Sequence, residues 1–130
     1  MTELSDRDCW ELLATARYGR LAYHLLGEVH IVPVNYITEP AARRLIFRTT
    51  EGSKLLGVAM NEDVAFEIDD VVGEVAWSVV VRGRARVLEG RAARAVDDLP
   101  LVSWVDYEQH RAVAVEVSDV SGRRFALRRA

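Results

Sequence analysis

The segment IFRTTEGSKL at residues 46–55 gathers the side-chain types from which proteins build small anion sites. It contains the only lysine of the chain, because the other sixteen basic residues are all arginine. Hydroxyl groups can donate hydrogen bonds to a phosphate, and a guanidinium can bind two of its oxygens at once. The hydroxyl-bearing and cationic residues of the segment are Arg48, Thr49, Thr50, Ser53 and Lys54. The pattern is typical of a phosphate site where a strand turns into a helix, since the first helical turn presents unpaired N–H groups.

The same residues also have a simpler interpretation. Ser and Thr in front of a helix usually cap it, and a basic side chain at a strand end usually reaches water. The segment lacks the paired glycines and the Gly-Lys-Ser/Thr order of a Walker phosphate loop. Taken alone, these residues therefore favour capping over anion binding.

No other group of residues predicts dedicated catalytic chemistry. The three histidines, His24, His30 and His110, lack the spacing of metal ligands, so no metal site is predicted. The adjacent carboxylates at 69–70 and 97–98 are expected to be solvated ends or caps of elements. The catalytic residues thus remain unassigned from sequence.

The composition bounds the class of protein. With 130 residues, half of them hydrophobic and 28% charged, the chain is predicted to form one domain over residues 1–130. A net charge of -3 provides no broad basic field for nucleic acid. A lone Cys9 favours a reducing cytosol, and the longest apolar run, residues 75–81, is too short to cross a membrane. The start of the chain lacks the pattern of a secretory signal, so a cytoplasmic, soluble protein is expected.

Residues 5–19 are predicted to form the helix that precedes these motifs. Ser5 is placed to act as its N-cap with Asp8 three residues later, and Gly19 is placed to end it. Cys9 falls in the apolar stretch of this helix and is expected to be a buried, inert thiol.

Strands over 19–26 and 29–38 are predicted to form a hairpin across Gly27 and Glu28. Pro33 lies inside the second strand and cannot donate to a ladder. It therefore indicates an edge, a bulge or an interruption at which a flat ligand could approach the backbone.

The rest of the chain alternates between short strands and helices. A turn is predicted over 39–43, helices over 52–61 and 90–99, and strands over 44–50, 63–69, 74–89, 111–120 and 123–129, the last two around Ser121 and Gly122. In the longest strand Val79 and Val81 point one way, and Arg82, Arg84 and Arg86 point the other. Such a series of short antiparallel strands predicts a small barrel.

The order of the motifs resembles the pyridoxamine 5'-phosphate oxidase-like family of FMN-binding split β-barrels, in its small actinobacterial-type branch. The stretches that carry the resemblance are GRLAY (19–23), PVNY (33–36), IFRTTEGSKL (46–55) and WSVVVRGRARVLE (77–89). Together they span most of the chain, although each is short. The resemblance implies a mainly β fold, an antiparallel split barrel of six or seven strands with short flanking helices.

The resemblance also implies where FMN would bind. Arg48, Thr49, Ser53 and Lys54 would surround its phosphate, with Thr50 close by. The strand with Pro33, Val34, Asn35 and Tyr36 would run along the flavin ring, although Tyr36 is equally well explained as a core or interface aromatic. Family members are usually homodimers with the flavin in the interface, so Trp77 and Ser78 would reach it from the partner subunit.

The implied function is an FMN-dependent oxidoreductase acting on an unidentified small substrate. Vitamin B6 oxidation is disfavoured, because the chain ends in RRFALRRA and lacks the family's Trp-Arg-Leu-type signature. The turn over 39–43 also departs from the Asp-Gly hairpin of close relatives. One alternative is a reductase that uses the deazaflavin F420, and the polyanionic tail of F420 would then lie along Arg82, Arg84 and Arg86. The simpler interpretation of this row of arginines is a solvated face. Another is a non-catalytic flavin binder or sensor.

Overall fold

The computed structural model describes residues 1–50, 60–97 and 110–127. The strands in these ranges are β1 (Thr2–Glu3), β2 (Tyr18–Leu25), β3 (Glu28–Asn35), β4 (Ile37–Glu39), β5 (Arg44–Thr50), β6 (Met60–Val72), β7 (Val75–Val87) and β8 (His110–Ala126). The helices are α1 (Asp6–Thr15), α3 (Gly90–Asp97) and the 3-10 helix η1 (Pro40–Ala42). None of the helices in the described ranges has the length and apolar character that a membrane span requires.

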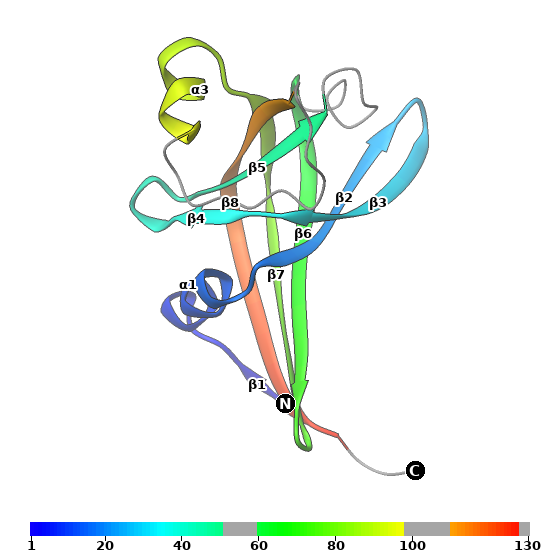
Figure 1. The fold of residues 1–130 in the computed structure, drawn as a ribbon. Helices are drawn as coiled ribbons and strands as arrows, with labels where there is room; N and C mark the ends of the chain where they lie inside the picture. The colour runs from blue at the N-terminus through cyan, green and yellow to red at the C-terminus, as the bar shows by residue number, and fades with distance from the viewer. Residues whose placement is uncertain (51–59, 98–109, 128–130) are drawn as a thin grey trace.

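The strands form one antiparallel sheet in the order β3-β2-β6-β7-β8-β5-β4, with β1 beside β8. Figure 1 shows the long strands β6, β7 and β8 side by side, with β2 and β3 crossing them obliquely. In the described residues β3 and β4 end the path, so the sheet curls into a barrel that stays open. The predicted mainly β, antiparallel split barrel is confirmed.

Two apolar clusters lie on opposite sides of β5. Its alternation sends Phe47 into the barrel interior and Ile46 to the outer face, where Ile46 packs with Leu88 and with Val96 of α3. The largest fully buried side chains of the interior are Leu13, Leu21, Leu45, Phe47, Phe66, Ile68, Val79 and Val81. Each such burial stabilises the fold by about 1.5–3 kcal/mol, so the interior holds α1 firmly against the sheet.

Helix α1 begins as predicted but ends earlier. The Ser5 hydroxyl accepts a 3.1 Å hydrogen bond from the backbone N–H of Asp8, which confirms Ser5 as the N-cap. The helix ends at Thr15, and Gly19 lies inside β2, so its prediction as a helix stop is wrong. A Cβ on Gly19 would lie 2.3 Å from Cζ of Phe66. The glycine therefore allows β6 to approach β2 closely.

The β2–β3 hairpin is confirmed, with its loop one residue earlier than predicted. Leu25 pairs with Glu28, so Leu26 and Gly27 form the two-residue loop. Both have positive φ, 51° and 81°, the combination that matches the twist of a tight hairpin. Among the described strands β3 ends the sheet, which agrees with an edge position, one of the three alternatives that Pro33 indicated.

The predicted pair of carboxyl-terminal strands is wrong, because β8 is a single strand from His110 to Ala126. Ser121 and Gly122 lie within it and pair with Val80 and Val79. A Cβ on Gly122 would meet Sγ of Cys9 at 2.7 Å. The glycine therefore marks the place where α1 packs on the strand, and not a turn.

Several other predictions can be placed. The turn over 39–43 is η1, and α3 confirms the start of the helix predicted over 90–99. The helix predicted over 52–61 lies outside the described residues, except that positions 60 and 61 belong to β6. In β7 the predicted alternation holds from Val79 to Arg86, while at the start of the strand Ala76 is buried and Val75 is exposed.

Candidate functional site

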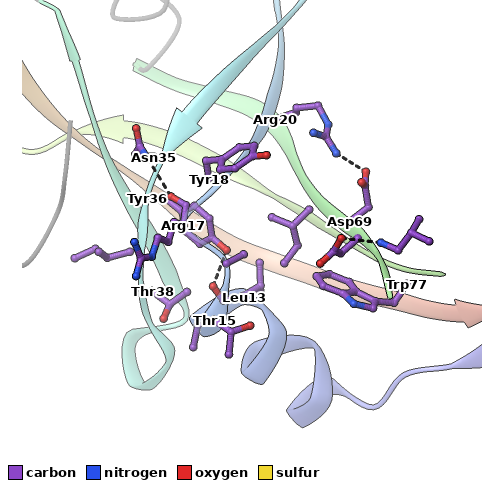
Figure 2. Close-up of a pocket in the computed structure, with 16 residues that line it drawn as sticks. Leu13, Thr15, Arg17, Tyr18, Arg20, Asn35, Tyr36, Thr38, Asp69 and Trp77 are labelled. Carbon is purple, nitrogen blue, oxygen red and sulfur yellow. Dashed lines mark hydrogen bonds and ion pairs between the residues drawn. The ribbon is translucent and has the colours of Figure 1, made fainter. Parts of the chain in front are cut away.

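An open cleft of about 1300 Å³ lies where the end of α1 meets the sheet. Its walls come from the segment between α1 and β2, the end of β3 with β4, the second half of β6, and Trp77 of β7. Figure 2 shows the side chains that line it. Segments far apart in the sequence thus surround one solvent-accessible space.

Tyr36 forms the back wall of the cleft. It is 4% exposed, and its hydroxyl donates a 2.6 Å hydrogen bond to the backbone carbonyl of Leu13. Its ring meets that of Phe66 edge-on at 4.7 Å. Burial raises the pKa of the Tyr36 phenol well above its ordinary value. Tyr36 is therefore a core aromatic that also lines the cleft.

Asn35 is anchored at the edge of the same cleft. Its Nδ2 donates to the carbonyl oxygen of Arg17 at 3.3 Å, and the backbone N–H of Tyr36 donates to the same oxygen at 3.3 Å. Within the described chain no hydrogen bond reaches its Oδ1. Asn35 can therefore offer an acceptor to an N–H group of a ligand.

Arg20 and Asp69 line the side of the cleft opposite Asn35 and form a cluster with Glu67. The sequence did not predict this cluster. Arg20 is the register partner of Glu67, and its Nη2 lies 2.8 Å from Oε1 of that residue and in contact with Oδ2 of Asp69. Burial, and then Asp69, raises the pKa of Glu67. A hydrogen bond with Glu67, aided by Arg20, lowers the pKa of Asp69.

Asp69 and Asp70 are exposed, as predicted, but they do not lie at an element end, because β6 continues to Val72. Carboxylates two residues apart on a strand lie on one face, so Glu67 and Asp69 both point toward Arg20. The sequence signal that could have indicated this cluster is the pair of acidic residues, Glu67 and Asp69, at alternate positions of one strand. Their basic partner lies on β2, almost fifty positions earlier, and could not be identified from them.

Some of the residues predicted to contact the flavin ring line the cleft, and the others do not. Asn35, Tyr36 and Trp77 all line the cleft, and Trp77 does so within the same chain. Val34 is buried in the barrel interior and Pro33 is exposed on the edge strand; neither lines the cleft, and neither does Ser78. The structure therefore brings together three of the six residues predicted to contact a ring.

The predicted phosphate residues are not brought together in the described part of the chain. Nη2 of Arg48 donates to the carbonyl of Val96 at 3.1 Å, on the face of β5 that α3 covers. Thr49 is its neighbour on the strand and faces the other way, 9% exposed. Thr50 pairs through its backbone with β8, while Ser53 and Lys54 lie outside the described residues. The phosphate site remains a prediction.

The arginine row on β7 is exposed and flanked by carboxylates from both neighbouring strands. Nη1 of Arg82 lies 3.9 Å from Oδ2 of Asp119, and Nε of Arg84 lies 3.7 Å from Oδ1 of Asp63. Arg86 is in contact with Glu116. The interpretation as a solvated face is supported, since each guanidinium already has an acidic neighbour. In the part of the chain that is described, no three His, Cys, Asp or Glu side chains cluster as a metal site would require.

Comparisons with known proteins found a family profile and several similar proteins. A family profile described as pyridoxamine 5'-phosphate oxidase matches residues 5–124. The structure of the FAD binding protein from Mycobacterium smegmatis is similar with a TM-score of 0.82 and 38% identity, covering 95% of this chain and 99% of that one. A conserved protein of unknown function from Corynebacterium diphtheriae has a TM-score of 0.81 and 36% identity, covering 97% and 98%. An uncharacterised protein of Mycobacterium tuberculosis is 30% identical, over 96% of this chain and 86% of its own length.

Proposed function

Because the chain belongs to the pyridoxamine 5'-phosphate oxidase family, we propose that it is a flavin-dependent oxidoreductase acting on a small substrate. The observation that carries the proposal is the cleft, which three predicted ring contacts, Asn35, Tyr36 and Trp77, line together. The relative from Mycobacterium smegmatis that shares 38% of its residues is an FAD binding protein. A bound flavin would supply the hydride chemistry, and the chain would bind and orient it.

The residues of the cleft fit such a group. Ligand pockets usually measure about 300–1,000 Å³, so a cleft of about 1300 Å³ can admit a flavin and a small substrate. Trp77 and Tyr18 provide aromatic surface, and Ile68 and Val71 provide aliphatic surface. The free acceptor of Asn35 suits an N–H group at the edge of a flavin ring.

The residues of the cleft are suited to positioning a ligand. The proton of Tyr36 is donated to the carbonyl of Leu13, so this phenol orients the wall and is not a proton donor to a ligand. Asn35 is fixed through Arg17, and Asp69 is fixed through Arg20. Such preorganised groups bind without losing side-chain freedom at the moment of binding.

The cofactor is tested by titrating the purified protein with FAD, FMN and F420, following flavin fluorescence and absorption. The stretch like FRTTEGSK favours FMN as the cofactor. The FAD binding relative makes FAD the main alternative to FMN. F420 ranks third, because the arginine row that would hold its tail already lies against carboxylates. Failure of both flavins to bind would reject the proposal.

Activity is tested by adding NADH or NADPH to the flavin-loaded protein and supplying nitroaromatic, quinone and tetrapyrrole acceptors. Reduction followed by turnover supports the oxidoreductase. Bound flavin that neither nucleotide reduces, with no acceptor consumed, would instead identify a non-catalytic flavin binder or sensor.

The phosphate part of the proposal rests on Lys54 and is tested by Lys54→Ala. Charge-assisted hydrogen bonds contribute about 1.5–3 kcal/mol. The substitution should therefore weaken FMN at least about tenfold and leave riboflavin, which has no phosphate, unchanged. Equal weakening of the two ligands in parallel titrations would show that Lys54 does not contact the phosphate.

We also propose a homodimer with the flavin in its interface. The β6–β7 end of the sheet exposes apolar side chains that continue from the cleft wall at Val71: they are Val72, Val75, Phe125 and Leu127. A second copy would remove this surface from water and enclose the cleft. The free, buried Cys9 supports a reducing compartment, and we retain the cytoplasm as the proposed location.

A further inference from the structure

The charged side chains of the cleft differ in how far they are already engaged. Arg20 is held by Glu67 and Asp69, and Oδ1 of Asp70 accepts the backbone N–H of Val71 at 2.8 Å. The guanidinium of Arg17 is exposed and has neither a hydrogen bond nor an ion pair within the described ranges. Arg17 is therefore the cleft-lining cation whose charge no described side chain offsets.

The backbone of Arg17 is nevertheless fixed. Its carbonyl oxygen accepts two hydrogen bonds, from Nδ2 of Asn35 and from the N–H of Tyr36, each of 3.3 Å. The side chain thus extends from a firmly held point, between α1 and β2. Rigid backbone beneath a free guanidinium reduces the ordering that a ligand must impose on it.

The charge of the cleft is segregated. Figure 2 shows Arg17, Asn35 and Thr38 on one side, and Asp69 with Trp77 on the other. On the Trp77 side the carboxylates of β6 outnumber the single guanidinium of Arg20. An anionic group is repelled there and attracted at Arg17, so the cleft favours one orientation of an elongated anionic ligand.

We propose that Arg17 is the anion subsite of this cleft and binds the phosphate or carboxylate oxygens of a ligand whose flat body lies toward Trp77. A guanidinium suits both groups, because its planar fork can donate two parallel hydrogen bonds to one carboxylate or phosphate. The anionic oxygens have two sources, the outer phosphate of FAD or a carboxylate on the substrate. The inference rests on the proposed function, because it takes the flat body of the ligand to be a flavin or the substrate of the flavin enzyme.

The phosphate source is tested by titrating wild type, Arg17→Gln and Arg17→Lys with FAD, FMN and riboflavin. If Arg17 meets the outer phosphate, Arg17→Gln weakens FAD at least about tenfold and leaves riboflavin unchanged, and Arg17→Lys recovers part of the loss. Arg7→Gln is the matched control, because it removes the same charge from an exposed site on α1 outside the cleft.

The carboxylate source is tested with 1-naphthoate and the neutral 1-naphthamide on protein loaded with the flavin that binds, by following the flavin absorption band. If Arg17 meets a substrate, Arg17→Gln weakens naphthoate at least about tenfold, leaves naphthamide unchanged and leaves every flavin affinity unchanged. Unfolding curves of the variants should match wild type, since within the described ranges the exposed side chain of Arg17 has no hydrogen bond or ion pair to lose.

The inference is overturned if Arg17→Gln changes neither FAD nor naphthoate binding relative to Arg7→Gln, including the case in which naphthoate does not bind wild type. It is also overturned if charged and neutral ligands weaken equally. Absence of flavin binding to wild type is a separate result, which would reject the proposed function itself.

Discussion

At the scale of single residues, the phenol of Tyr36 links the fold to the cleft. Its hydroxyl bonds the last turns of α1 at Leu13, and its ring packs against Phe66 of β6. Tyr36→Phe would leave the Leu13 carbonyl buried without this donor. We expect a loss of about 1–2 kcal/mol in the free energy of unfolding, measured by urea denaturation. Tyr18→Phe, at a residue 52% exposed, should cost less, and equal losses would contradict the assignment.

Glu67 predicts a pH dependence of stability. Because its pKa is raised in the fold, the protonated carboxyl is the form that folding favours. This contribution is complete below the ordinary value of about 4.3 and is lost as the pH rises above it. The free energy of unfolding of wild type, relative to Glu67→Gln, should therefore fall as the pH is raised above this value. A difference that grows with pH in urea titrations would refute the raised pKa.

At the scale of elements, the packing of α1 against β8 depends on Gly122. A Cβ there would meet Cys9 Sγ at 2.7 Å and Cδ1 of Leu4 at 3.0 Å. Gly122→Ala should therefore lower the unfolding free energy by about 1–3 kcal/mol, as overpacking of a filled site usually does. Ser121→Ala, at the exposed neighbouring position, should stay within about 0.5 kcal/mol of wild type in the same thermal unfolding assay. A tolerated alanine at 122 would mean that α1 can shift freely.

The element boundaries show where sequence reasoning works and where it fails. Ser5 caps α1 and Pro33 marks an edge strand, because capping and the missing proline N–H act on the residue itself. Gly19 and Gly122 were interpreted as breakers, since a glycine that makes room for another segment looks locally like one that ends an element. The difference lies in which distant side chain, Phe66 or Cys9, comes close.

At the scale of the whole molecule, the proposed homodimer makes the apolar end of β6, β7 and β8 an interface. Val72→Glu with Phe125→Glu should therefore convert dimer to monomer in size-exclusion chromatography with light scattering, because burying unpaired carboxylates is costly. Flavin affinity should fall in parallel. Ala92→Glu with Ala95→Glu adds the same charges on exposed positions of α3 and should leave the dimer intact. A monomeric wild type would reject this part of the proposal.

By itself, the sequence determined the barrel class, the starts of most strands and the family, because alternation, caps and short motifs are encoded by neighbouring residues. It also predicted Asn35, Tyr36 and Trp77 as ring contacts, and these three residues line one cleft. Only the tertiary structure decided that Arg20 joins Glu67 and Asp69, 47 and 49 residues away, and so leaves Arg17 as the cleft-lining cation without an ion pair among the described residues. Contacts across such separations depend on how the strands pair, and no local pattern records that pairing.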